Sequence, residues 1–183
     1  METVKQKEQK AFEAMKEQFG YTNVMQAPKV LSVTISSSFG KIKSDKNKVE
    51  LIGEKLAQIT GQKPQEILAK KSIATFKVRE GEKTAYKVSL NGERKYEFLD
   101  KLINISIPRT KDFRGIKLTG VDQMGNLSIG VKENVIFPET GDEEIRNIFG
   151  LSMTINSSAS SKEEATEFFK LIGIPFKKEE ESK

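Results

Sequence analysis

The sequence predicts one domain of the α+β class. Segments whose apolar residues recur at helical spacing are separated by shorter segments in which apolar and polar residues alternate. The 183 residues contain no internal repeat and no dividing linker rich in proline, glycine or serine, and this length suits one domain. We therefore expect a single domain over residues 1–176 and a charged, disordered tail over residues 177–183.

The first predicted elements are a helix and a strand. Phe12, Met15 and Phe19 recur at helical spacing before Gly20, a residue type that often ends helices. Residues 30–37 then alternate, which favours a strand with one apolar face and one small, hydroxylated face. The apolar face is expected to hold Leu31, Val33, Ile35 and Ser37, and the hydroxylated face Val30, Ser32, Thr34 and Ser36.

The middle of the chain is predicted to hold two more helices and several short strands. A buried stripe over residues 44–59 indicates a helix that Gly61 ends, and the stripe consists of Val49, Ile52, Leu56 and Ile59. Strands are expected at residues 66–68, 72–78 and 85–90, and the turn dipeptide Asn91-Gly92 leads into a helix that stops before Pro108. Tyr96, Leu99 and Ile103 are its expected packing residues, and Arg94 and Lys95 of the same helix are candidate RNA contacts.

The last third is predicted to begin with short strand-like pieces divided by glycines, with a tight turn at Gly125-Asn126. Residues 151–157 alternate as a final strand. Ser161 followed by Glu164 has the spacing of a capping box, which opens a final helix. Its inward residues are predicted to be Ala165, Phe168, Phe169 and Ile172, and Gly173 and Pro175 are expected to end it.

Two residue types are absent, and their absence excludes much chemistry. With no cysteine and no histidine, the chain has no thiolate nucleophile, no Ser-His-Asp triad and no cysteine or histidine metal site. No apolar run reaches the roughly 20 residues of a membrane span, and the N-terminus is too charged for a secretory signal. We expect a cytoplasmic protein with no membrane partner, no cofactor and no catalytic residue.

Positive charge is concentrated in the middle of the chain. The net charge is +5, and residues 63–117 hold fourteen basic but only seven acidic residues. In residues 61–81 the cations are interleaved with apolar residues that could anchor the segment in a core. This pattern favours RNA as the partner.

Several ordered blocks resemble one known family. The blocks are GQKP, AKKSI, FKVREG, GERKYEFLDKLIN, PRTKDFRG and a late IPF, and the resemblance runs collinearly from Phe19 to Phe176. The family is that of the universal large-subunit ribosomal protein that binds 5S ribosomal RNA. The resemblance implies a concave antiparallel β-sheet backed by α-helices, in a noncatalytic protein of the central protuberance. The implied partners are 5S and large-subunit ribosomal RNA and neighbouring large-subunit proteins.

The resemblance also assigns three sets of residues. A 5S RNA surface is implied at Lys29, Ser36, Gln62, Lys63 and Ser89. A loop directed at the tRNA in the peptidyl site is implied at Lys70, Lys71, Ser72, Lys77 and Arg79. A bridge to a small-subunit protein is implied at Asp112, Arg114 and Gly115.

The chain departs from the family pattern at two places. Ser36 stands where the family usually has Asn, so a bidentate amide contact is lost there. Residues 82–85 replace a Met-Pro-Ile-Gly turn, which changes the turn types available to the loop.

The sequence leaves alternatives open at two sites and for the function as a whole. Phe76 is predicted to be a core residue, with stacking on a base as the alternative. A metal-dependent enzyme acting on RNA could use the carboxylates Glu139, Asp142, Glu143 and Glu144, although adjacent acids more often mark a helix N-terminus. A general RNA-binding factor working outside the ribosome is the third possibility.

Overall fold

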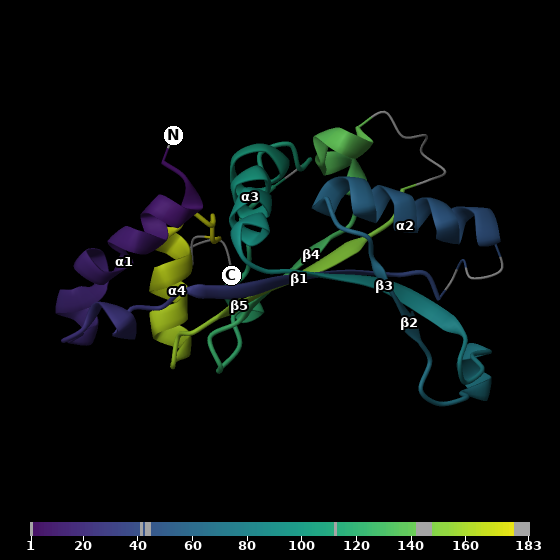
Figure 1. Cartoon of the computed structure of the whole chain (residues 1–183), viewed down its shortest axis with the longest axis horizontal. Helices are drawn as coiled ribbons and strands as arrows, with labels where there is room; N and C mark the ends of the chain where they lie inside the picture. Colours follow the sequence, from purple (N-terminus) through teal and green to yellow (C-terminus); the bar gives the residue numbers. More distant parts are fainter. Residues whose placement is uncertain (1, 41, 43–44, 112, 142–147, 178–183) are drawn as a thin grey trace. The chain divides into compact units, whose positions relative to one another are not determined.

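The structure is a computed structural model that describes residues 2–40, 42, 45–111, 113–141 and 148–177. It has the predicted α+β class, with a five-stranded antiparallel sheet in the order β2-β3-β1-β5-β4 (Figure 1). The chain forms two compact units, of which unit 1 comprises residues 1–33, 90–129 and 154–183 and unit 2 comprises residues 34–89 and 130–153. Strands β1, β3, β4 and β5 have residues in both units. The assignment of residues 1–176 to one domain stays a prediction.

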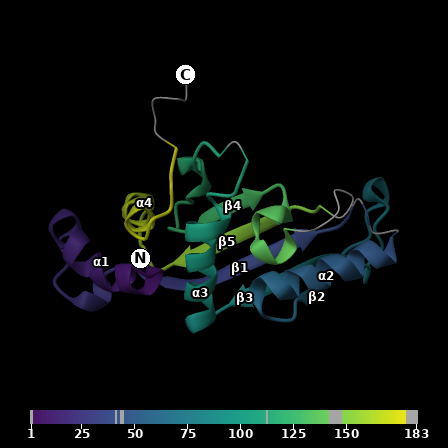
Figure 2. The same cartoon turned by 90° about the horizontal axis from the view of Figure 1, so that it is seen from above.

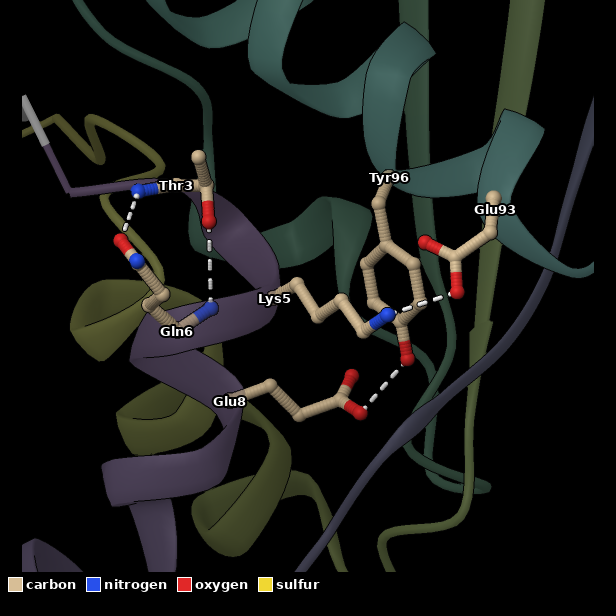
Figure 3. Close-up of polar contacts among 6 residues, drawn as sticks. All are labelled: Thr3, Lys5, Gln6, Glu8, Glu93 and Tyr96. Carbon is tan, nitrogen blue, oxygen red and sulfur yellow. Dashed lines mark hydrogen bonds and ion pairs between the residues drawn. The ribbon is translucent and has the colours of Figure 1, made fainter.

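Helix α1 spans Val4–Phe19 in unit 1. The Thr3 hydroxyl accepts a hydrogen bond from the Gln6 amide, and the Gln6 side chain accepts one from the Thr3 amide, so a capping box begins the helix (Figure 3). Gly20 takes the left-handed conformation and ends it, as predicted. The buried face is formed by Val4, Ala11 and Met15 rather than by the predicted phenylalanines, of which Phe12 and Phe19 are only half-buried.

Helix α3, Glu93–Lys101, is joined to α1 by polar contacts. The Tyr96 hydroxyl donates to Glu8 Oε1 at 2.7 Å, and Lys5 Nζ lies 2.6 Å from Glu93 Oε1 (Figure 3). The predicted helix does not stay α-helical to Pro108, because Leu102–Ser106 form a π-helix. The backbone widens there, which sequence periodicity does not reveal.

Strand β1 spans Val30–Ser38, after a short 3₁₀-helix at Val24–Gln26. From Ser32 to Ser37 its burial alternates as predicted: Val33, Ile35 and Ser37 are buried, and the residues between them are half-buried. The first two residues reverse the prediction. Val30 is buried and Leu31 is 56% exposed.

Helix α2, Lys46–Thr60, covers one face of the neighbouring strand β3, Lys83–Leu90, in unit 2 (Figures 1 and 2). The predicted stripe of Val49, Ile52, Leu56 and Ile59 is buried, Asp45 caps the N-terminus, and Gly61 ends the helix with φ 66°. Helix and strand approach closely at Gly53, where an added Cβ would lie 3.1 Å from the Tyr86 ring. Strand β2, Gln65–Leu68, pairs antiparallel with β3.

The strand predicted at residues 72–78 is not formed. Residues 69–82, which we call the arm, instead form a long loop that connects β2 and β3 and contains a 3₁₀-helix at Ala74–Phe76 (Figure 1). The alternation of apolar and polar residues suggested a strand, but only Ile73 and Val78 form an isolated bridge, with each other. Without a sheet to pack against, the apolar side chains of this segment are not anchored in a core as predicted.

The remaining elements follow the predictions closely. Strand β4 spans Leu127–Val131, after a turn in which the Gly125 amide donates to the Asp122 carbonyl. Strand β5 spans Leu151–Ser157, and helix α4 spans Lys162–Leu171. Ser161 accepts from the Glu164 amide at the α4 N-terminus, and the predicted inward residues are buried. Further 3₁₀-helices lie at Leu118–Gly120, Asn134–Ile136 and Pro138–Thr140.

Candidate nucleic-acid interface

The outward side chains of β1 and β3 in unit 2 are mainly hydroxylated or basic. In β1 of unit 2, Ser36 is half-buried between the inward-facing residues Ile35 and Ser37. In β3, Lys87 and Ser89 are exposed between the buried Tyr86, Val88 and Leu90. The sequences of β1, β3, β4 and β5 contain neither Asp nor Glu. Such strands offer hydrogen-bonding groups without repelling a phosphate backbone.

The structure brings Gln62 and Lys63 toward Ser89. Gln65 of β2 pairs with Lys87 of β3 in an antiparallel register, so the residues preceding Gln65 extend toward the Ser89 end of β3. Lys63 is exposed and Gln62 is half-buried. The Thr60 hydroxyl, which donates to the Gln62 carbonyl at 3.1 Å, fixes the turn that carries both residues.

Lys29 lies in unit 1, immediately before β1. Its amide donates to Ser158 Oγ and its carbonyl accepts from the Ser158 amide, both at 2.9 Å. The backbone of Val30 is bonded by side chains of two helices. Its amide donates to Glu8 Oε2 of α1, and its carbonyl accepts from Lys95 Nζ of α3. By sequence Lys95 is a candidate RNA contact, but its ammonium group serves this internal bond.

Unit 1 also contains polar side chains that the sequence prediction did not select. Asn156 Nδ2 of β5 donates to Ser32 Oγ of β1 at 2.8 Å, and Ser128 Oγ of β4 lies 3.4 Å from Thr154 Oγ1 of β5. These pairs are side chains of neighbouring strands on one sheet face. The alternation of residues 151–157 marked Thr154 and Asn156 as outward-facing, but only the pairing of β5 with β1 and β4 shows which side chains they meet.

The arm carries the residues predicted to face tRNA. Lys70, Lys71, Ser72, Lys77 and Arg79 are all exposed. Ser72 has a structural contact as well, since its hydroxyl accepts from the Glu80 amide at 2.9 Å. The departure at residues 82–85 leaves an ordered turn, in which Glu82 Oε2 accepts from the Arg79 amide and Gly81 takes φ 80°.

The core position predicted for Phe76 is wrong. Its side chain is 70% exposed at the end of the arm, and Ile73 is 46% exposed. The prediction assumed that Phe76 shares a strand face with Ala74 and Val78, but the 3₁₀-turn removes that common face. The arm therefore presents an aromatic ring together with its cations.

The predicted bridge residues lie only partly within the described residues. Asp112 lies outside them, and Arg114 is exposed. Gly115 has φ 93°, and an added Cβ would lie 2.6 Å from the Lys177 amide nitrogen. The adjacent Ile116 exchanges backbone hydrogen bonds with Pro175 and Lys177, so close packing of two backbone segments accounts for glycine at this position.

Ionisable groups here serve mainly structural contacts. The hydrogen bond from Lys83 to Glu66, at 2.5 Å, raises the pKa of that lysine. The backbone amide of Asn126 donates to Asp122 and lowers the pKa of that carboxyl group. Within the described ranges, no three acidic residues converge on a possible metal site. Of the four carboxylates considered for metal binding, Asp142, Glu143 and Glu144 lie outside those ranges.

Comparison with known proteins identifies the family. The family described as "Ribosomal protein L5" matches residues 23–79, and the family described as the C-terminus of the same ribosomal protein matches residues 83–176. The large ribosomal subunit protein uL5 of Flavobacterium johnsoniae is 45% identical over 165 residues, which cover 90% of each chain. The chain belongs to the ribosomal L5 family.

Other L5 proteins are similarly close over nearly their whole length. The large ribosomal subunit protein uL5 of Thermoanaerobacter sp. is 43% identical over 93% of this chain and 96% of its own. That of Halothermothrix orenii is 43% identical over 87% and 89%. L5 proteins are structural and not enzymatic, so family membership confirms the prediction of a noncatalytic protein and removes the metal-dependent enzyme. Within the described ranges, no helix is long and apolar enough to cross a membrane.

Proposed function

We propose that this L5 protein, a structural constituent of the large ribosomal subunit in the cytoplasm, binds 5S ribosomal RNA. In this function it links 5S RNA to large-subunit RNA in the central protuberance, beside neighbouring large-subunit proteins. The observation that carries the proposal is the hydroxylated face of β1 and β3, two strands without an acidic residue, with Lys63 and Gln62 extending toward Ser89. Hydroxyl and amide groups suit the 2′-hydroxyls and base edges of a shaped RNA, while lysines neutralise phosphates.

The proposed 5S contacts divide between the two units. Ser36, Gln62, Lys63 and Ser89 belong to unit 2, and Lys29 belongs to unit 1. Lys29 has its backbone fixed by Ser158, while its side chain is half-buried, with Nζ 3.4 Å from Met25 Sδ. Ser36 supplies one hydroxyl in place of a bidentate amide, so its contribution is expected to be small.

The arm is proposed to approach the tRNA in the peptidyl site. Its exposed cations Lys70, Lys71, Lys77 and Arg79 suit the phosphates of a folded RNA. Ser72 is assigned mainly to the shape of the arm, through its bond with the Glu80 amide. The bridge to a small-subunit protein is proposed at Asp112, Arg114 and Gly115. Exposed Arg114 would contact the partner, and Gly115 would set the backbone beside it.

Binding of purified protein to 5S RNA and to an unrelated structured RNA tests the proposal. We expect tighter binding to 5S RNA, with log affinity falling against log salt by about 0.7 to 0.9 per neutralised phosphate. The double variant Gln62→Ala/Lys63→Ala should weaken 5S binding while its thermal transition stays near that of the parent. Lys162→Ala, at an exposed cation of α4, is the matched control and should bind as the parent does.

Two results would count against the proposal. Equal affinity for both RNAs would remove the specific 5S function, and a large loss of thermal stability in the double variant would make the turn structural. The alternative of a general factor outside the ribosome makes a separate prediction, because such a protein would be absent from salt-washed large subunits.

A further inference from the structure

Phe76 has an unusual position for a phenylalanine in a folded protein. Its side chain is 70% exposed, in the short 3₁₀-helix Ala74–Phe76 at the end of the arm. Phenylalanine is among the residue types most often found buried, and leaving its ring in water forgoes the hydrophobic stabilisation that burial provides. A ring held in water at this place is therefore a candidate contact for a partner.

The ring is displayed by an ordered segment. At the base of the arm, the Ala69 amide donates to the Glu82 carbonyl and the Gly81 amide donates to the Ala69 carbonyl, at 2.8 and 3.0 Å. Near the tip, Ile73 and Val78 exchange two backbone bonds of 2.9 and 3.1 Å. These bonds fix the backbone on both sides of Phe76, so little conformational entropy remains to be lost when a partner binds the ring.

The surroundings of the ring decide the kind of partner. Residues 69–82 hold four cations and two carboxylates, and one of the carboxylates, Glu82, accepts a hydrogen bond from the Arg79 amide. The following residue, Lys77, is exposed and has φ 51°. An aromatic ring among cations suits a nucleobase attached to phosphates better than the apolar surface of a protein.

We propose that Phe76 stacks on an unpaired base of the RNA that the arm approaches, while the arm cations contact the neighbouring phosphates. This inference rests on the proposed tRNA contact of the arm and adds to it a residue and a type of contact. Stacking requires a base face that is open to solvent, as in the loops of a folded RNA, and a fully paired helix offers none along its length. The arm would thereby distinguish a looped RNA from a duplex of equal charge.

The chain contains no tryptophan, so Phe76→Trp introduces one fluorophore at the tip. Titration of this variant of the full chain with deacylated tRNA should quench its fluorescence, because an indole stacked on a base loses emission. A fully paired RNA duplex of equal length should bind through the same cations with much less quenching. Met124→Trp is the control, since Met124 is 74% exposed in unit 1 and its fluorescence should not change.

Affinity gives a second, independent measurement. In large subunits assembled with variant chains, Phe76→Ala should weaken tRNA binding at the peptidyl site by about 5-fold to 150-fold, the range that corresponds to about 1 to 3 kcal/mol of stacking. Phe76→Tyr should retain the affinity. Phe76→Leu, which is apolar without a π-face, should lose most of it.

The outcomes separate the stacking inference from the proposed function. If Lys70→Ala/Lys71→Ala weakens tRNA binding but Phe76→Ala does not, the arm contacts tRNA and the stacking inference is wrong. If neither variant changes binding, both are wrong. Equal quenching by tRNA and duplex, or no quenching at saturating tRNA, would also overturn stacking, and the latter result would favour a protein as the partner of the tip.

Discussion

The Tyr21 hydroxyl donates a hydrogen bond to Glu164 Oε1, joining two buried residues that are 143 positions apart. Glu164 Oε2 accepts from the Ser160 amide at 2.7 Å, and the Glu164 amide donates to Ser161 Oγ. The Glu164 carboxylate therefore bonds both Tyr21, two residues after α1, and the backbone just before α4. A buried charge with its hydrogen bonds complete is stable, whereas removal of one partner leaves it unsatisfied.

Tyr21→Phe is expected to lower the free energy of unfolding by about 1.5 to 3 kcal/mol, because it removes a charge-assisted bond and leaves a buried acceptor. Urea unfolding measures the loss. In a double-mutant cycle with Glu164→Gln, the two changes should be non-additive. Additive effects would mean that the two residues act independently.

Alkaline pH is expected to destabilise the protein. Burial and the hydrogen bond to Glu164 raise the pKa of Tyr21 well above its usual range, and burial with the bond to Glu8 does the same to the pKa of Tyr96. Above about pH 10 the unfolded chain loses these protons while the folded chain keeps them, so stability is complete below that pH and falls as pH rises. Unfolding measured from pH 8 to 11 should show this decline, and Tyr96→Phe should make it shallower. An unchanged slope in the variant would contradict the assignment.

Two glycines with positive φ should respond differently to alanine. At Gly61, with φ 66° and open space around it, Gly61→Ala should cost about 1 kcal/mol of backbone strain. At Gly115 the added Cβ also meets the backbone of Lys177, so Gly115→Ala should cost about 2 to 4 kcal/mol. Thermal unfolding of the two variants gives the comparison. Equal losses would show that the backbone at Gly115 relaxes freely.

Ser72→Ala should loosen the arm without affecting the rest of the fold. The variant removes the acceptor for the Glu80 amide, so hydrogen exchange at that amide should become faster. The thermal transition should move by about 2 °C or less, as for other surface changes. Ser38→Ala, at an exposed serine of β1, should leave exchange at Glu80 unchanged. Unchanged exchange in Ser72→Ala would show that the bond to the Glu80 amide does not stabilise the arm, which would leave RNA contact as the role of Ser72.

The accuracy of the sequence predictions followed how local each signal was. Helices α2 and α4 were placed within one or two residues, because a cap residue, an apolar stripe and a glycine stop all lie within one segment. Strand β5 was placed at its observed bounds from alternation alone. The strand predicted in the arm was wrong, because alternation creates a buried face only where a neighbouring sheet covers it.

The candidate interface shows the same division. Its chemistry could be predicted, because cations, hydroxyls and the lack of acids in four strands are properties of the sequence. Which cations face solvent could not be predicted. Lys95 Nζ donates a hydrogen bond to the Val30 carbonyl, and only the packing of α3 beside β1 shows this bond. Likewise the sequence does not show that Gly115 lies against the distant backbone of Lys177, or that the Ser72 hydroxyl accepts from the Glu80 amide within the arm.

By itself, the sequence determined the class of the fold, helices α1 to α4, strands β1, β2, β3 and β5 and the membership of the L5 family, because caps, periodicity and ordered motifs are local or collinear. Only the tertiary structure decided which side chains are exposed. Burial depends on neighbours that the chain brings from far away, which is why Val30 became buried and Phe76 was left in solvent.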